Sequence, residues 1–256
     1  MLCFYMRKLN IFYYLCNMKA TRIIQERINA MGFGVIFGYS DLGLPADMQV
    51  AGAMALSRMV ARNELKKAGR GKFYKPELSR LGEMPLMPEQ LTKDLLFKND
   101  KRIGYVTGAP AFAKMGLTTQ ISSKILIGSS KYRRPENRAG YIISFTKQVN
   151  EITDDTIPML RFLDALKFIK QIPATAPDEV ITVLLQQLKM MSQEQRVQVM
   201  DLAMNYSASV RAILGAMLEF LNIECEQLKS SLNVFTTYKP GISGSTLPTI
   251  KNWNIL

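Results

Sequence analysis

The chain has 256 residues, of which 48% are hydrophobic and 21% are charged, so it can bury a sizeable core and does not have the composition of a disordered protein. Its formal net charge of +12 favours polyanionic partners, with nucleic acid first and an anionic membrane surface second. Because the chain contains no histidine, Ser-His-Asp sites, Cys-His sites and metal sites with histidine ligands are excluded.

The three cysteines are Cys3, Cys16 and Cys225. They are far apart, follow no metal-binding spacing and are odd in number, which argues against a disulfide framework and favours a reducing, cytoplasmic location. The sequence contains neither a Walker motif nor a GxGxxG motif. We therefore expect no cofactor and no metal ion.

Residues 1–17 are rich in aromatic side chains and show no periodicity. Their apolar stretch is shorter than the ~20 residues that a transmembrane helix needs, and no small-residue cleavage site follows it. We interpret this segment as an upstream extension, with Met18 as the functional start. A membrane-surface anchor is the alternative interpretation. No other apolar run approaches membrane-spanning length, so we expect no membrane partner.

Residues 18–80 contain eleven basic and five acidic residues and have a distinct order of elements. Apolar spacing predicts a helix over 19–31, and β-branched and aromatic residues predict a short strand at 35–37. Ser40 is expected to cap a short helix and Asp47 a longer one that ends near Asn63. Two strands, 64–68 and 72–75, flank Gly69-Arg70-Gly71, which is typical of a tight turn.

This order is that of a winged helix-turn-helix, in which the third helix enters the major groove of DNA. The hairpin cations would contact phosphates or the minor groove. We expect DNA contacts from the third helix and the hairpin: Gln49, Ser57, Arg58, Arg62, Lys66, Lys67, Arg70, Lys72, Tyr74 and Lys75. Winged helices also serve as protein-interaction modules, with a basic hairpin that is merely solvated, and this alternative stays open.

Prolines and a glycine interrupt residues 76–90, which we predict to be a linker to a second domain at 89–222. There we expect a helix over 89–99, strands at 102–108, 124–128 and 141–145, and a short helix over 109–115. A second basic loop lies between the last two strands. It would contact phosphate or an acidic protein face, or be only solvated, through Lys131, Arg133, Arg134 and Arg138.

Helical patterns follow at 156–170 and 178–190. Ser192 to Gln195 forms a capping box for a third helix, and Ser207 is expected to cap a fourth. Asp154 and Asp155 are expected at a helix N-terminus, where acidic residues are favourable. Together these helices predict a small bundle. Residues 223–256 are rich in Ser, Thr, Gly and Pro and are predicted to be a poorly ordered tail.

Gly128-Ser129 after a predicted strand is compatible with a nucleotidyltransferase active site. Such a site needs a nearby pair of carboxylates to hold metal ions. The next acidic residues are Glu136, in the basic loop, and then Glu151 and Asp154, so no paired carboxylate follows on a strand. We therefore predict that the protein is not an enzyme.

Several segments together resemble the AbiEi-like antitoxins of type IV toxin–antitoxin systems, and a related bacterial family of unknown function. These segments are Gly-Arg-Gly-Lys-Phe-Tyr-Lys-Pro (69–76), Arg-Ile-Gly-Tyr-Val-Thr-Gly (102–108), Gly-Leu-Thr-Thr-Gln (116–120) and Phe-Leu-Asp-Ala-Leu (162–166). The resemblance covers residues 19–222. It implies a winged helix that represses its own promoter and a second domain that counters a nucleotidyltransferase-like toxin.

The sequence therefore predicts an α+β protein, with an N-terminal winged helix followed by a mixed α/β domain that ends in a helical bundle. The expected function is that of a DNA-binding transcriptional regulator of antitoxin type. Its partners would be a double-stranded DNA operator and a cognate toxin. The alternative is a protein-interaction module that neutralises a partner protein without binding DNA specifically.

Overall fold

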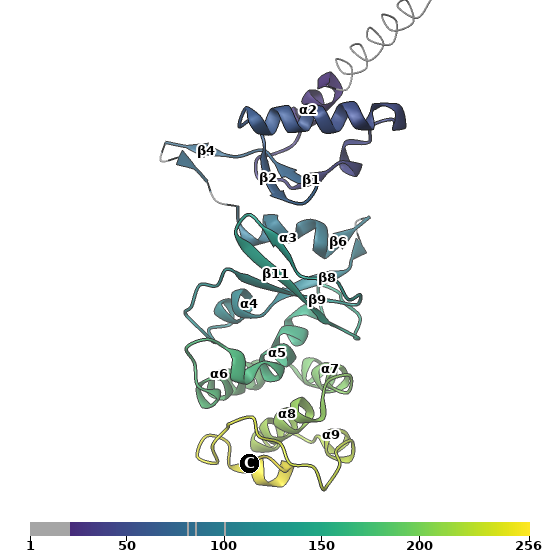
Figure 1. The fold of residues 1–256 in the computed structure, drawn as a ribbon. Helices are drawn as coiled ribbons and strands as arrows, with labels where there is room; N and C mark the ends of the chain where they lie inside the picture. The colour runs from purple at the N-terminus through teal and green to yellow at the C-terminus, as the bar shows by residue number, and fades with distance from the viewer. Residues whose placement is uncertain (1–20, 81, 85, 100) are drawn as a thin grey trace, which may run out of the picture. The chain divides into compact units, whose positions relative to one another are not determined.

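The computed structural model describes residues 21–80, 82–84, 86–99 and 101–256, so the expected extension at 1–17 lies outside the described residues. The chain has a mixed α+β fold, drawn in Figure 1, and divides into two compact units. The first unit runs through Asp94 and also contains Glu136–Gly140. The second unit consists of Leu95–Pro135 and Tyr141–Leu256.

The first unit begins, in its described part, with a helix over residues 21–30. It continues with β1 (Phe37–Gly38), η1 (Ser40–Leu42), η2 (Ala46–Met48), α2 (Gln49–Ala61), β2 (Lys66–Gly69) and β3 (Lys72–Tyr74). Strand β3 pairs in antiparallel fashion with both β1 and β2, so the sheet order is β1-β3-β2. Segments far apart in the sequence therefore share one small sheet beside α2 (Figure 1).

The core of the first unit is built from one face of α2 and from apolar residues of the helix and sheet around it. Leu56 and Met59 of α2 pack with Ile24 and Ile28 of the first helix and with Phe73 of β3. The buried residues of α2 recur at helical spacing: Ala51, Gly52, Ala55, Leu56 and Met59. The opposite face of the helix is therefore left for solvent or a ligand.

Two of the predicted helix caps in this unit are wrong. Ser40 is the first residue of η1, whereas Tyr39 occupies its cap position. The local bond is made instead by Asp41, whose carboxylate accepts from the backbone N–H of Gly38 at 2.7 Å. Asp47 lies inside η2, and Met48 occupies the cap position of α2. A short 3₁₀ turn thus leads into α2, where the sequence pattern predicted a capped start.

The hairpin turn lies at Arg70-Gly71. Gly71 has φ +66°, a conformation that glycine adopts without strain. The pairing of β2 with β3 shifts between Lys67 and Gly69, which indicates a bulge at the end of β2.

The segment predicted to be a linker has structure of its own in the first unit. It contains a two-stranded hairpin, β4 (Leu78–Ser79) and β5 (Gly82–Glu83), followed by the start of α3 (Pro88–Leu96). Strand β10 (Glu136–Arg138) also belongs to this unit, although the chain on either side of residues 136–140 belongs to the second unit.

The second unit opens with a small hairpin and with three strands of a four-stranded sheet, whose fourth strand is β10. Its first elements are β6 (Phe97–Lys98), β7 (Lys101–Arg102), β8 (Gly104–Thr107), α4 (Ala109–Lys114), β9 (Lys124–Ser129) and β11 (Tyr141–Lys147). Strand β9 pairs antiparallel with β8 and parallel with β11. Parallel neighbours need a crossover connection, and here residues 130–140 provide it.

Helices make up the rest of the second unit. They are α5 (Ile157–Lys167), η3 (Ile169–Gln171), α6 (Pro177–Met190), α7 (Gln193–Ala203), α8 (Ala208–Phe220), α9 (Glu226–Ser230) and η4 (Pro248–Trp253). Helix α5 contacts β8 and also α7 and α8, so it lies between the sheet and the other helices (Figure 1). A helix in such a position must be apolar on several sides. Eight of its eleven residues are buried, which is consistent with this position.

The predicted capping box at Ser192 is confirmed, because Ser192 Oγ accepts from Gln195 N–H and Gln195 accepts from Ser192 N–H. Asp154 and Asp155 lie directly before α5, as expected for a helix N-terminus, but neither caps the helix, because Thr156 occupies the cap position. Thr153 and Thr156 hydrogen-bond to each other across the start of α5, and Asp154 instead pairs with Arg102 at 2.5 Å.

The prediction of a poorly ordered tail at 223–256 is also wrong. Trp253 is 2% exposed, and Leu247, Ile250 and Ile255 are buried in the same core as α8. The ring of Trp253 lies over Gly215 of α8, where any side chain would collide with it. The tail is therefore an integral layer of the second unit. Its buried residues are irregularly spaced, so no periodic pattern in the sequence indicates them.

Candidate nucleic-acid interface

The outward face of α2 carries the predicted reading residues. Gln49, Ser57, Arg58 and Arg62 are all exposed. Arg58 donates to the backbone oxygen of Met54 one turn earlier, and Arg62 lies 3.8 Å from Glu64. Arg58 lies in the C-terminal half of α2, and Arg62 is the residue that caps its C-terminus. The N-terminal half offers only Gln49 as an exposed polar group.

Exposed apolar side chains lie beside these polar groups. Val50 is 62% exposed and Met54 is 46% exposed. Val50 lines a groove of about 680 Å³ between η1 and α2, together with Tyr39 and Leu44. An apolar surface at this position can contact thymine methyl groups or the side chains of a protein partner.

Two cations of the β2–β3 hairpin are exposed and have no partner among the described residues. Lys67 and Arg70 are exposed, and within the described residues neither forms an ion pair or a ring contact. Lys67 lies on β2 and Arg70 lies in the turn. These two side chains are free to meet phosphates.

The other hairpin residues expected to contact DNA have partners within the protein. Lys66 pairs with Glu83 at 3.1 Å, and Lys72 pairs with Asp94 at 3.0 Å. The ammonium group of Lys75 lies over the ring of Phe33, 4.5 Å from its centre. These three lysines therefore contribute positive potential with less freedom to reach a ligand.

Tyr74 is only 7% exposed, so it does not present its hydroxyl group to a ligand as predicted. The hydroxyl donates to Glu83 at 3.0 Å. Burial, and then the neighbouring Glu83 carboxylate, raises the pKa of Tyr74 to about 12. Phe73 and Tyr74 are both buried, and because successive side chains of a strand point to opposite faces, Tyr74 lies on the face opposite Phe73, where it meets Glu83 of β5.

The second basic loop divides into exposed and buried members. Lys131 and Arg134 are exposed, while Arg133 is half-buried and lies over the ring of Phe145. Arg138 is 2% exposed, so its predicted role as a surface contact is wrong. It is held by Asp94 and Glu136 and donates to the backbone oxygen of Leu91. Arg138 therefore supports the structure of the first unit.

The second unit contains a buried polar cluster that the sequence analysis missed. Asp164 of α5 is 1% exposed and accepts from the hydroxyl groups of Tyr105 at 2.7 Å and Tyr206 at 3.0 Å. The side-chain amide of Gln148 donates to both hydroxyl oxygens. Burial raises the pKa of Asp164, although these hydrogen bonds oppose the shift. The cluster joins β8, α5 and the start of α8, so its geometry is that of a structural network.

One signal in the sequence could have revealed this cluster. Asp164 lies between Leu163 and Ala165, within a helix whose other side chains are mostly apolar. An acidic residue at such a position must be either solvated or satisfied by buried donors.

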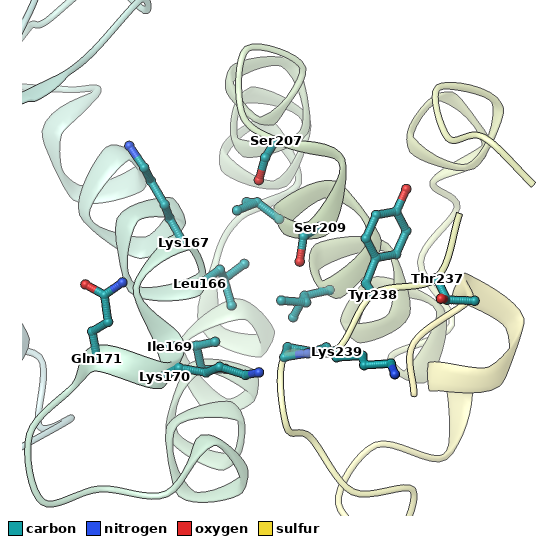
Figure 2. Close-up of a pocket in the computed structure, with 13 residues that line it drawn as sticks. Leu166, Lys167, Ile169, Lys170, Gln171, Ser207, Ser209, Thr237, Tyr238 and Lys239 are labelled. Atoms are coloured by element: carbon teal, nitrogen blue, oxygen red, sulfur yellow. The ribbon is translucent and has the colours of Figure 1, made fainter. Parts of the chain in front are cut away.

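A pocket of about 370 Å³ in the second unit lies between η3, the start of α8 and the 237–240 segment (Figure 2). Lys170, Ser207 and Ser209 line it, together with the largely buried Tyr238. Ser207 occupies the cap position of α8 as predicted, but its hydroxyl makes no capping bond. No carboxylate lines the pocket, so it lacks the paired acids of a two-metal site.

Within 21–80, 82–84, 86–99 and 101–256, no three Cys, Asp or Glu side chains gather closely enough to hold a metal ion. Across the same part of the chain, no helix is both long enough and apolar enough to span a bilayer.

No family model and no curated protein sequence matches the chain. Among solved structures, the chain is similar to the crystal structure of the RV2827C protein from Mycobacterium tuberculosis, with 15% identity and a TM-score of 0.48. The alignment covers 82% of each chain.

Proposed function

We propose that the first unit is a winged helix-turn-helix that binds double-stranded DNA. The proposal is supported by the element order: a helix, β1, two short 3₁₀ helices, α2 and the β2–β3 hairpin, with β1 completing the sheet. In proteins built in this order, the third helix enters the major groove and the hairpin reaches the neighbouring backbone or minor groove.

In this proposal α2 reads the base edges. Gln49 and Ser57 would make hydrogen bonds in the groove, and Val50 and Met54 would contact thymine methyl groups. Arg58 and Arg62, farther along the helix, would reach phosphates. Apolar and amide groups at the front of the helix, with cations behind them, suit a helix inserted by its N-terminal end.

One observation carries the proposal: among the described residues, two cations of the hairpin have no ion-pair or ring partner. Lys67 and Arg70 extend from the hairpin, whereas Lys66, Lys72 and Lys75 have partners within the unit. Only cations that are free of partners gain the full benefit of releasing counterions from DNA. Lys67 and Arg70 are therefore the residues on which we place the phosphate contacts.

We further propose that the protein acts in the cytoplasm as a transcriptional regulator of antitoxin type. This part rests on the resemblance to AbiEi-like antitoxins. The first unit would repress its own promoter, and the second unit would counter a nucleotidyltransferase-like toxin. The second unit is proposed to act by binding and not by catalysis.

The groove beside α2 favours a second candidate function. Tyr39, Leu44 and Val50 offer an apolar surface that could receive side chains of a partner protein. In that case the first unit would be a protein-interaction module, and its affinity for DNA would be low and independent of Lys67 and Arg70.

Fluorescence anisotropy with the full chain separates the two candidates. We expect labelled promoter-region duplex to bind at low salt, and Lys67→Ala combined with Arg70→Ala to weaken binding by about tenfold. The matched control is Lys189→Ala combined with Lys251→Ala, which removes two exposed lysines of the second unit and should leave the affinity unchanged. An equal loss in both double variants would mean that only net charge matters, and no binding at low salt would refute the DNA proposal.

A further inference from the structure

Strand β2 lies at one edge of the first unit's sheet, and a segment distant in the sequence is attached to it. The backbone N–H of Ala139 donates to the carbonyl oxygen of Ala68 at 2.9 Å. A side chain at Gly69 would come within 3.2 Å of the carbonyl oxygen of Asn137. Residues 136–140 therefore lie directly along the hairpin that carries Lys67 and Arg70.

A partly buried group of ion pairs connects the same segment to the other hairpin strand. Arg138 donates to both carboxylate oxygens of Asp94, at 2.5 and 3.2 Å, and to the backbone oxygen of Leu91. Asp94 also pairs with Lys72 of β3 at 3.0 Å. One carboxylate thus joins the inserted segment to the hairpin.

The charge state of Asp94 is consistent with this role. Burial alone would raise the pKa of Asp94. The hydrogen bonds and positive charges of Arg138 and Lys72 outweigh burial and hold the pKa below its ordinary value. The carboxylate therefore stays ionised and keeps both cations at neutral pH.

The chain enters and leaves residues 136–140 from the second unit. Pro135 and Tyr141, which flank this segment, both belong to the second unit. The segment forms part of the crossover that the parallel strands β9 and β11 require. A displacement of that crossover would therefore be transmitted to β2 through residues 136–140.

We propose that residues 136–140, anchored by Arg138 to Asp94, are a clasp that positions the β2–β3 hairpin for DNA and links it to the second unit. This inference rests on the proposed DNA binding. Asp94 and Arg138 are positioning residues, because neither is exposed toward a ligand. By reciprocity, DNA bound at the hairpin stabilises the clasp, and events that release the clasp weaken DNA binding.

The test uses a substitution for which two accounts predict opposite results. Asp94→Asn removes one negative charge next to a basic hairpin and frees Lys72. If Asp94 only neutralised charge, the variant would bind duplex DNA more tightly. If the clasp positions the hairpin, Asp94→Asn binds about fivefold more weakly in spite of its extra positive charge.

Glu64→Gln is the matched control. It removes one negative charge from the same unit, but Glu64 is exposed and lies 3.8 Å from its cation, Arg62. We expect this variant to bind at least as tightly as the wild type. Tighter binding by both variants would overturn the clasp proposal.

Hydrogen exchange of the full chain supplies a readout that does not depend on DNA affinity. The amide of Ala139 should exchange faster in Asp94→Asn than in Glu64→Gln, and added duplex should slow its exchange in the wild type. Equal exchange in both variants would contradict the clasp. If the wild type bound no DNA, the DNA proposal would fail, and the clasp would be judged by exchange in the two variants.

Arg138→Lys provides a second route if Asp94→Asn does not fold. It keeps the positive charge and removes the two-pronged contact with Asp94. Weaker DNA binding and faster exchange at Ala139 support the clasp, and wild-type values of both contradict it.

Discussion

Asp164 is fully buried and Asp94 is partly buried, and their surroundings shift the pKa values of the two carboxyl groups in opposite directions. Asp164 has hydroxyl donors but no cation among its hydrogen-bond partners, and burial raises its pKa. Asp94 is held by two cations, and its pKa is lowered. The type of partner therefore decides which charge state each carboxyl favours.

The first prediction concerns the pH dependence of Asp164. Its pKa in the folded state lies above the ordinary value of about 3.9, so the folded protein binds this proton more tightly than the unfolded chain does. The free energy of unfolding of the wild type, relative to Asp164→Asn, should rise as the pH falls through the folded pKa toward 4. Urea unfolding at several pH values measures it. A difference that does not change with pH would contradict the account.

The opposite sign is expected for Asp94. Its folded pKa is depressed, so its stabilisation is fully present above about pH 3.9 and is lost as the pH falls through the folded value. The difference in unfolding free energy between the wild type and Asp94→Asn should therefore be constant between pH 5 and 7. A decline already evident between pH 7 and 6 would assign the effect to another group.

The burial of Arg138 could not be predicted from the sequence around it. Arg138 stands in a run with Lys131, Arg133 and Arg134, and nothing local distinguishes the buried guanidinium from its exposed neighbours. Its partner Asp94 is 44 residues away. The exposed cations of α2 could be identified from helical spacing, but partners distant in the sequence decided which hairpin cations remain free.

Among the elements, those with regular periodicity could be predicted and those without it could not. The helices of the bundle and the β2–β3 hairpin follow from apolar spacing and a glycine turn. The tail was missed because Leu247, Ile250, Trp253 and Ile255 follow neither helical nor strand spacing. Its order comes from packing on α8, which no local pattern reveals.

The packing of this tail on α8 can be tested by substitution. Trp253 lies over Gly215, and its indole N–H donates to Glu219 of α8. Trp253→Ala should lower the free energy of unfolding of the second unit by about 3–5 kcal/mol, because it removes a large buried ring and leaves a cavity in the core. Chemical denaturation followed by circular dichroism measures the loss.

Phe235→Ala is the control for this prediction. Phe235 belongs to the same tail but is 92% exposed, so its removal should change stability by less than about 0.5 kcal/mol. If Trp253→Ala were as mild as Phe235→Ala, the tail would not be part of the core.

Gly215→Ala changes the same contact on the α8 side. An added methyl group would lie about 2.1 Å from the indole ring, so the tail must shift to accept it. We expect a loss of about 1–3 kcal/mol by the same denaturation measurement. Combining Gly215→Ala with Trp253→Ala should cost less than the sum of the single changes, since the collision disappears with the ring. Strict additivity would show that Gly215 and Trp253 do not meet.

For the whole molecule, charge is distributed unevenly along the chain. Basic residues outnumber acidic ones by eleven to five over residues 18–80, whereas acidic residues outnumber basic ones by eight to five over residues 151–205. A basic N-terminal segment followed by an acidic helical segment suits a protein that binds a polyanion through the first and a different partner through the second. The clasp would allow these two activities to influence each other.

The salt dependence of duplex binding by the full chain tests the central claim most directly. If five or so phosphates are neutralised, the logarithm of the association constant falls against the logarithm of salt concentration with a slope of about −4 to −5. Replacing both Lys67 and Arg70 by Ala should reduce the slope by about 2, and replacing Lys189 and Lys251 should leave it unchanged. A flat salt dependence, or a slope that Lys67 and Arg70 do not affect, would contradict DNA binding by the first unit.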